Sequence, residues 1–278
     1  MKKRRIMPVI SGVVGLILTV ALWLGMIALP QLRPKGTRYD RTVGVLPIGQ
    51  AQMVAHRGLS GQTLENTVQA FELAGQSDYY GIEADVQVTA DGRYIIAHDG
   101  DLERIAGLDI EISETDYDTL RALRFKDPYA DTDEEFFLPS LEEYIEICVR
   151  YDKQAVLELK GDMTAKDVCG IVAAVEKCGW FGRTTFISFS RDHLLHLREG
   201  YPTASAQYII EEWTEENVSF MIDNQIDADL RWDLVKNRRV KELHNAGLIV
   251  NCWTVDGALC AAVMAACGVD FITTNILE

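Results

Sequence analysis

The chain has 278 residues, 48% of them hydrophobic and 25% charged, which is enough for one large globular domain with or without an appendage. The formal net charge is -15, but residues 1–41 hold eight Lys or Arg and one acid, which leaves 19 basic and 41 acidic residues, or -22, in the rest. A body this acidic argues against nucleic acid as a partner, because phosphate backbones need basic surfaces. An anionic substrate would therefore need a local positive site.

The N-terminus predicts a membrane anchor. Residues Ile6 to Pro30 carry no charge and follow four consecutive basic residues, and about 25 apolar residues can span a bilayer. A cleaved signal peptide is the alternative, but it would have a shorter apolar core and a small-x-small cleavage site. We expect residues 1–30 to form a basic cytoplasmic flank and an uncleaved signal anchor. Residues 31–50 then form a tether, and the acidic body lies outside the cell membrane in a single-pass protein.

From residue 51 onward, short apolar runs alternate with amphipathic stretches. A first strand, Met53 to Ala55, ends at His56, and a helix over residues 66–76 follows, with Asn66 as a possible N-cap. A hairpin comes next, with strands over 82–89 and 94–97 around the turn Ala90-Asp91-Gly92. Residues 100–139 are polar and acidic and predict an insertion, in which Ser113 could cap a short helix. A helix over 141–150 follows, with Ser140 as its N-cap.

The alternation then becomes regular to the end of the chain. We expect strands over 155–159, 184–189, 204–210, 227–234, 248–254 and 269–273, and helices over 164–178, 191–199, 214–225, 236–245 and 258–267. Together with the first strand and the first strand of the hairpin, these make eight strands separated mostly by helices. Regular alternation implies a parallel sheet, and eight units in residues 51–278 match a (β/α)8 TIM barrel. A doubly wound sheet is the alternative, made less attractive by the absence of a Gly-rich dinucleotide or phosphate-loop motif.

Two carboxylates stand on one face of the hairpin. Glu83 and Asp85 are two residues apart on a strand, so they point the same way, although their neighbours are apolar. Buried together they would repel each other, and a divalent cation with oxygen ligands would relieve that repulsion. His98 and Asp99 close the return strand. Alone, this pattern fits a solvated hairpin with a polar face equally well.

A barrel places functional residues at the carboxyl ends of its strands. The charged and imidazole groups there gather over the first three strands. The polar residues at those ends are His56, Arg57, Glu83, Asp85, Glu158, Lys160, Ser188, Ser190, Gln207, Arg231, Trp253, Thr273 and Thr274. The other histidines, His193, His196 and His244, lie on predicted helices away from this rim, and we interpret them as surface or packing residues.

Taken in order, these pieces resemble the signature of the glycerophosphodiester phosphodiesterases. The resemblance covers essentially all of residues 51–278. Its motifs are His56-Arg57-Gly58, Glu65-Asn66-Thr67, Glu83-x-Asp85, Thr89-x-Asp91-Gly92, His98-Asp99, Leu138-Pro139-Ser140-Leu141-Glu142-Glu143, Leu157-Glu158-Leu159-Lys160, Ile187-Ser188-Phe189, Asn251-x-Trp253-Thr254-Val255 and Gly268-Val269-Asp270-x-Ile272-Thr273-Thr274. The departures are Gly100 directly after Asp99 and Ile105-Ala106-Gly107 after Arg104. They bear on the leaving group rather than on the reaction.

The resemblance implies one TIM barrel that binds a single divalent cation, Ca²⁺ or Mg²⁺. It implies His56 and His98 as the acid–base pair and Glu83, Asp85 and Glu158 as metal ligands. Substrate would be bound by Arg57, Lys160, Glu65, Asn66 and Trp253. The implied reaction releases sn-glycerol 3-phosphate and an alcohol from a lipid-derived glycerophosphodiester.

Several alternatives stay open at this stage. Arg57 could merely brace Glu65, Glu158 and Lys160 could be a plain ion pair, and Trp253 could be a core residue. The reaction could instead be of the lysophospholipase D type or a phosphatidylinositol phospholipase C-like cleavage, or the barrel could be a non-catalytic membrane module. The sequence does not fix the oligomeric state. Six cysteines without a CxxC pair are interpreted as small buried hydrophobes, with disulfides still possible.

Overall fold

The computed structural model describes residues 38, 39, 42, 44, 49–131 and 133–278. The predicted anchor and its basic flank lie outside these residues, and no helix among the described residues is both long enough and apolar enough to cross a bilayer. Described residues of the predicted tether contact the body of the protein, and Tyr39 donates its N–H to the Gly61 carbonyl at 2.7 Å. Arg38 pairs with the buried Asp127 at 2.7 Å, and Thr42 donates a hydrogen bond to Glu278.

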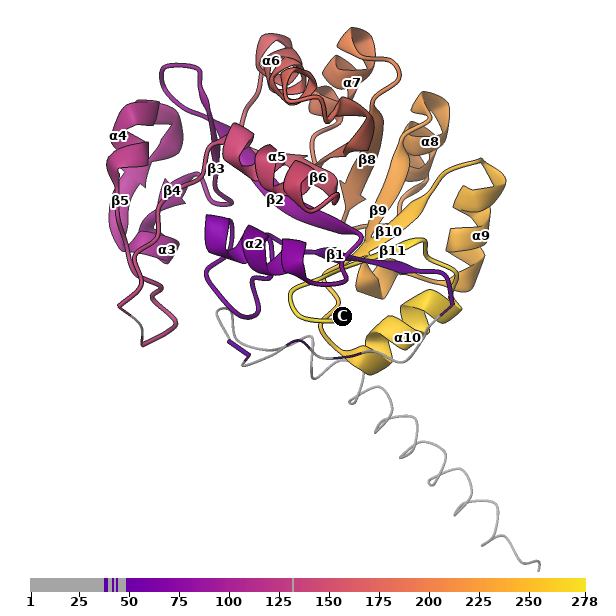
Figure 1. Cartoon of the computed structure of the whole chain (residues 1–278). Helices are drawn as coiled ribbons and strands as arrows, with labels where there is room; N and C mark the ends of the chain where they lie inside the picture. The colour runs from indigo at the N-terminus through magenta and orange to yellow at the C-terminus, as the bar shows by residue number, and fades with distance from the viewer. Residues whose placement is uncertain (1–37, 40–41, 43, 45–48, 132) are drawn as a thin grey trace, which may run out of the picture.

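Eight parallel strands form a closed ring (Figure 1). The ring closes because β1 pairs with both β2 and β11, so the barrel prediction is confirmed and the open doubly wound sheet is wrong. The strands are β1 (Gln52–Ala55), β2 (Gly81–Val88), β6 (Gln154–Leu159), β7 (Thr184–Ser188), β8 (Ser205–Ile210), β9 (Asp227–Arg231), β10 (Val250–Trp253) and β11 (Phe271–Thr274).

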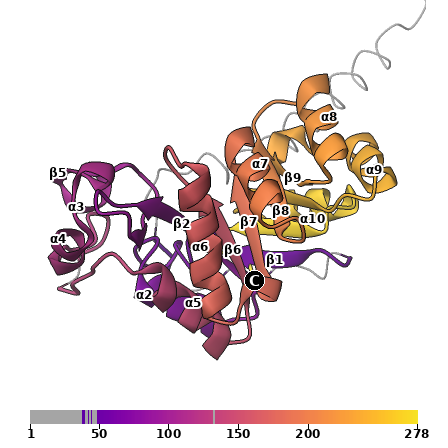
Figure 2. The same cartoon turned by 90° about the horizontal axis from the view of Figure 1, so that it is seen from above.

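Helices surround the ring, as the view from above shows (Figure 2). They pack on the outward-facing strand residues to make the main hydrophobic core, which includes Phe71, Ile82, Tyr144 and Phe186. Capping boxes begin α5 at Ser140 and α6 at Thr164, and the predicted role of Ser140 is thus confirmed. The helices are α2 (Val68–Gln76), α5 (Leu141–Arg150), α6 (Ala165–Lys177), α7 (Arg191–Gly200), α8 (Glu215–Asn224), α9 (Asn237–Asn245) and α10 (Ala258–Ala266), with single turns over Phe181–Arg183 and Trp232–Leu234.

The insertion is more ordered than its composition suggests. After β3 (Tyr94–Ile96), which pairs antiparallel with β2, the chain forms a lobe at one side of the barrel (Figure 1). The lobe contains β4 (Asp101–Leu102), α3 (Glu103–Ala106), β5 (Leu108–Glu111), a single turn over Ile112–Glu114 and α4 (Tyr117–Ala122). Its apolar residues, among them Leu102, Ile112 and Phe136, form a second core. The predicted cap at Ser113 is wrong, because that residue lies inside the single turn and α4 begins after Asp116.

The barrel interior is layered by the alternation of strand residues. An apolar layer of Val54, Val156, Ile187 and Ile209 fills the middle. Two residues further along the same strands come His56 and Glu158, which therefore lie toward the carboxyl-terminal mouth. Gln207 lies two residues before Ile209 and lines a cavity of about 120 Å³ with Gln154, Thr185 and Ser205 at the opposite end. Its predicted place on the catalytic rim is wrong.

All six cysteines are free. Burial of Cys148, Cys252 and Cys260 confirms the prediction for those three, whereas Cys169, Cys178 and Cys267 are only partly buried.

Candidate active site

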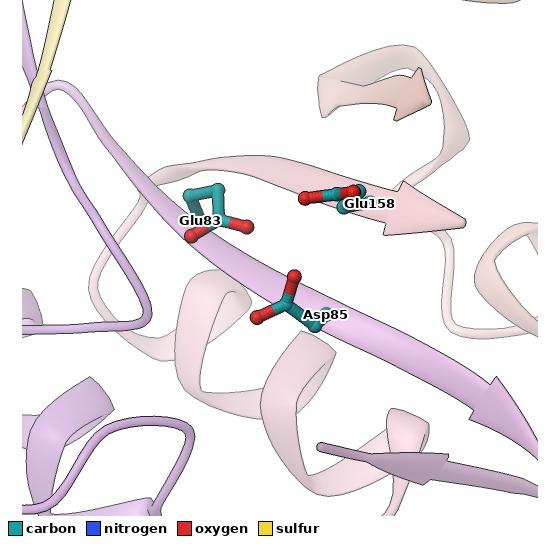
Figure 3. Close-up of side chains that lie close together, drawn as sticks. All are labelled: Glu83, Asp85 and Glu158. Atoms are coloured by element: carbon teal, nitrogen blue, oxygen red, sulfur yellow. The ribbon is translucent and has the colours of Figure 1, made fainter. Parts of the chain in front are cut away.

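Three carboxylates converge at the mouth of the barrel. Glu83 and Asp85 rise from β2, and Glu158 comes from the neighbouring strand β6, where it is the register partner of Asp85 (Figure 3). One oxygen from each lies within 4.8 Å of the others, and the three residues are 2%, 0% and 7% exposed. The structure thus brings together all three predicted metal ligands, because strand pairing places side chains from positions 73 residues apart in one register.

The electrostatics of this trio are unfavourable without a cation. Burial raises the pKa of Glu83 well above its usual range, and burial together with the Asp85 carboxylate raises the pKa of Glu158 to about 8. Burial also opposes ionisation of Asp85, but Arg57 and Lys160 outweigh it and hold the pKa of Asp85 below its usual range. Among the described residues, no group donates a hydrogen bond to the buried Oδ1 atom of Asp85, which lies 3.4 Å from Lys160 Nζ. A buried, crowded set of oxygen donors with an unused lone pair fits a hard divalent cation.

Two basic side chains flank the carboxylates. Lys160 Nζ lies 2.8 Å from Glu158 and 3.4 Å from Asp85, and Arg57 Nε lies 3.3 Å from Asp85. Arg57 also donates to Glu65 at 2.8 Å, so the bracing of Glu65 and the Glu158–Lys160 pair both exist. Both cations stand at the mouth, where an anionic substrate would meet them.

The loop after β1 is held in an unusual backbone conformation. Arg57 has a φ of 56°, and its N–H donates to Glu83 at 2.7 Å. Gly58 follows with a φ of 74°, and a Cβ there would lie 2.6 Å from the backbone of Ala70. Left-handed conformations cost free energy for residues other than glycine, so they persist only where surrounding contacts enforce them. Here the contacts come from Glu83, a predicted metal ligand, which accepts hydrogen bonds from the N–H groups of Arg57 and Gly58.

Asn66 is also left-handed, with a φ of 54°. Its Nδ2 donates to Asp85 Oδ2 at 2.7 Å, and its Oδ1 accepts the Asp85 N–H at 3.3 Å. The N-cap of α2 is Thr67, whose hydroxyl accepts from the Ala70 N–H. The predicted N-cap role of Asn66 is therefore wrong, and its contact with the site is present.

His56 is oriented by a residue from the far end of the chain. Its Nδ1 lies 2.8 Å from Asn275 Oδ1, which also accepts from Ser60, while Asn275 Nδ2 donates to Asp256 at 2.7 Å. This network makes Asn275 Oδ1 the acceptor and puts the proton of His56 on Nδ1, which leaves Nε2 free to accept. Burial, with Arg57 second, lowers the pKa of His56 to about 3, so the ring is neutral.

His98 is oriented by the insertion. Its Nδ1 lies 2.7 Å from Asp99 Oδ1, and Arg104 from α3 donates to Asp99 through Nε and to Glu65 at 2.6 and 3.0 Å. Arg57 and Arg104 together overcome the burial of Glu65 and lower the pKa of that carboxyl to about 2. An unbroken chain of charged contacts thus joins His98 to Arg57 and the carboxylate trio.

A family comparison decides the identity of this arrangement. The model of the glycerophosphoryl diester phosphodiesterase family matches residues 56–278. The chain belongs to this family. It is therefore an enzyme that hydrolyses phosphoric diesters, as the sequence predicts.

Individual relatives agree with this assignment. The chain is 27% identical over 234 residues to the Bacillus subtilis protein YhdW, provisionally named a glycerophosphodiester phosphodiesterase. The alignment covers 80% of this chain and 93% of YhdW. A crystal structure of a glycerophosphodiester phosphodiesterase from Parabacteroides distasonis aligns with a TM-score of 0.69 and 26% identity, over 82% of this chain and 93% of that one. An Oleispira antarctica phosphodiesterase, solved with the product sn-glycerol-3-phosphate, aligns with a TM-score of 0.71 and 24% identity, over 81% and 93%, and supports the shared fold.

Trp253 lies at the edge of the phosphodiesterase site. Its ring packs on the apolar layer of the barrel and meets Phe189 edge-on at 5.5 Å, and its Nε1 donates to the backbone of Asp229. It is only partly buried, so it is both a packing residue and available at the mouth. Ser188 has no such exposure: it is buried, and its hydroxyl hydrogen-bonds the buried His193.

Sequence reasoning missed four residues of the site: Asn275, Asp256, Arg104 as a partner of Asp99, and the exposed ring of Phe189. Asn275 follows β11 directly and Asp256 lies in the loop after β10, so the rule that placed the other rim residues could have found them. Arg104 comes from the insertion and gave no such signal.

Proposed function

We propose that the chain hydrolyses glycerophosphodiesters to sn-glycerol 3-phosphate and an alcohol, with one bound Ca²⁺ or Mg²⁺ and with His56 and His98 as the acid–base pair. The observation that carries this proposal is the trio Glu83, Asp85 and Glu158, buried between two oriented histidines. The product bound in the Oleispira antarctica neighbour supports the glycerol 3-phosphate half of the substrate.

The trio would hold the cation, which would neutralise the non-bridging oxygens of the diester and orient its phosphorus. Arg57 and Lys160, already placed beside the carboxylates, would add positive charge against the phosphate. Glu65 and Asn66 act through these residues, since Glu65 fixes the Arg57 guanidinium and Asn66 fixes the Asp85 carboxylate.

The two histidines divide the proton transfers. One free Nε2 takes the proton of the attacking oxygen, which is water or the neighbouring glycerol hydroxyl, as that oxygen bonds to phosphorus. The other ring starts as the imidazolium and gives its Nε2 proton to the leaving alkoxide as the bond from that oxygen to phosphorus breaks, which returns the ring to its neutral form. If the glycerol hydroxyl attacks, water then opens the cyclic phosphate. Asn275 and Asp99 engage Nδ1 of the two rings, which would leave each Nε2 to take part in this exchange.

The test is release of glycerol 3-phosphate from glycerophosphodiesters by the purified full-length chain, first with a chelator and then with Ca²⁺ or Mg²⁺ restored. We expect metal-dependent release, and losses of roughly 10²- to 10⁴-fold for His56→Ala and for His98→Ala. His244→Ala is the matched control, because His244 lies on α9 and pairs with Asp270 on the surface. Losses below about tenfold for both site variants would contradict the acid–base assignment. Turnover of lysolipids alone would contradict the substrate class.

We also propose that residues 1–30 anchor the enzyme in the cell membrane with the barrel outside. The support is the charge-free run Ile6 to Pro30 after four basic residues. Protease added to intact cells should remove the barrel while a cytoplasmic marker survives. Protection of the barrel would contradict this orientation.

A further inference from the structure

A second hollow lies at the barrel mouth, outside the carboxylate trio. It is a cavity of about 350 Å³ lined by Phe189, Tyr208, Ile209, Ile210, Glu211, Glu212, Asn217 and Arg231. These residues belong to the ends of β7, β8 and β9 and the start of α8. Phe189, Glu211 and Arg231 have the same strand parity as the interior layer, so they point into the mouth.

The cavity adjoins the catalytic residues. Phe189 forms one of its walls, and Lys160 Nζ lies 5.7 Å from the centre of the same ring. Lys160 in turn contacts Glu158 and Asp85. A diester held by its phosphate at the trio would therefore reach the cavity with one of its two arms.

The charge of the cavity is negative. Arg231 is its only cation among the described lining residues, and its Nε and Nη2 donate to Asp233 at 2.7 and 3.1 Å. Glu211 lies 3.7 Å from Arg231 and remains half exposed. Glu212 is exposed, and within the described part of the chain its carboxylate has no ion pair. The acids thus exceed the available positive charge in a space that opens beside an anionic substrate.

The aromatic wall adds a second element of recognition. Phe189 is 43% exposed, although it stands at the mouth of an otherwise well-packed barrel. Trp253 meets this ring at 5.5 Å and 90°, and Lys160 Nζ lies over the ring, 5.7 Å from its centre. An aromatic face next to carboxylates attracts organic cations, including those that cannot donate hydrogen bonds.

We propose that this cavity binds the alcohol arm of the diester and selects a cationic amino alcohol, such as choline, over a neutral or anionic alcohol. The inference rests on the proposed function, because it assumes a diester at the trio. Of the two arms, the glycerol arm is neutral in every such substrate, so the carboxylates of Glu211 and Glu212 can discriminate only through the other arm. They would also repel an arm that ends in a carboxylate or phosphate.

The test compares kcat/KM of the full-length, metal-supplied enzyme for glycerophosphocholine and for glycerophosphoglycerol. We expect a preference for the choline ester, and we expect the double variant E211Q/E212Q to lower the ratio about three- to tenfold, mainly through KM. Glu215→Gln is the matched control, since Glu215 lies four residues away on α8, is exposed and does not line the cavity. It should leave the ratio unchanged.

A second measurement separates this inference from the proposed function. Equilibrium binding of glycerophosphocholine, followed by calorimetry, should weaken in E211Q/E212Q and not in the control. Equal turnover of both diesters by the wild type, or a ratio that the double variant leaves unchanged, would overturn the cationic subsite while the hydrolase proposal stands. Binding that depends on Glu211 and Glu212 without any turnover would overturn the hydrolase proposal and leave the subsite standing. Absence of both preference and binding would overturn the subsite.

Discussion

Addition of Ca²⁺ or Mg²⁺ to the chelator-treated protein should raise its melting temperature. The reason is that Glu83, Asp85 and Glu158 are buried and crowded, and burial raises the pKa of Glu83 and Glu158. The folded chain therefore holds three oxygen donors together although their burial and mutual repulsion are unfavourable, whereas in the unfolded chain they are far apart. A cation that binds only the folded chain shifts the equilibrium toward it by mass action.

The size of the effect follows from the occupancy of the site. At a cation concentration 100-fold above the dissociation constant, linkage adds about 2.7 kcal/mol to the free energy of unfolding. For a domain of this size, each kcal/mol raises the melting temperature by roughly 2–4 °C, so we expect a rise of about 5–10 °C. Differential scanning fluorimetry or calorimetry after EDTA treatment would measure it, with a titration of each cation.

The variant Glu158→Gln keeps the shape of the side chain and removes one charge of the trio. It should lose most of the cation-dependent rise, and its melting temperature without cation should equal or exceed that of the wild type, because a repulsive neighbour of Asp85 is gone. Glu215→Gln, exposed on α8, is the control and should retain the full rise. An equal rise in Glu158→Gln and wild type, or no rise in the wild type with either cation, would refute the assignment of this trio as the metal site.

Three further predictions concern the surroundings of the site. Arg104→Ala should lower kcat roughly 10- to 100-fold in steady-state assays, because Asp99 would no longer be held in place beside His98. Arg104→Lys should recover part of the loss. An unchanged kcat would show that the network is only structural. Burial lowers the pKa of His193, so this side chain takes up its proton first in the unfolded chain as pH falls below about 6.5, and the protein loses stability there. His193→Asn should therefore flatten the slope of the unfolding free energy against pH by at most about 1.4 kcal/mol per pH unit. Identical slopes in the variant and the wild type would contradict this. Gly58→Ala should cost about 2–5 kcal/mol in denaturant titrations because its Cβ meets the backbone of Ala70, and a cost below about 1 kcal/mol would contradict the strained loop.

The carboxylate trio was predictable because two local rules suffice for it. Residues two apart on a strand share a face, which pairs Glu83 with Asp85, and the βα alternation makes the next parallel strand a neighbour, which brings Glu158. The rim rule could have placed Asn275 at the mouth, but neither of these two rules pairs it with His56, which is 219 residues away in the chain and meets it because the barrel closes between β1 and β11. The orientation of His56 thus depends on closure, a global property.

The left-handed residues show a different limit. A propensity argument places Asn66 at a helix N-cap because asparagine is common there, and Thr67 one position later satisfies the same rule. What decides between them is the demand of Asp85 for a donor at 2.7 Å, which pulls Asn66 to a φ of 54°. Local preference was overridden by a contact across 19 residues.

The insertion shows why a polar composition misleads. Its acids suggested a polar insertion with one short helix, yet Leu102, Ile112 and Phe136 bury a separate core, and that core fixes the short helix that carries Arg104. Arg104 then holds Asp99 behind His98 and Glu65 beside Arg57. One of the two histidines is therefore oriented by the barrel closure and the other by the lobe. Because the two supports come from separate cores, a change in the lobe should impair His98 while leaving the carboxylate trio and His56 in place. Metal binding should then survive a loss of turnover.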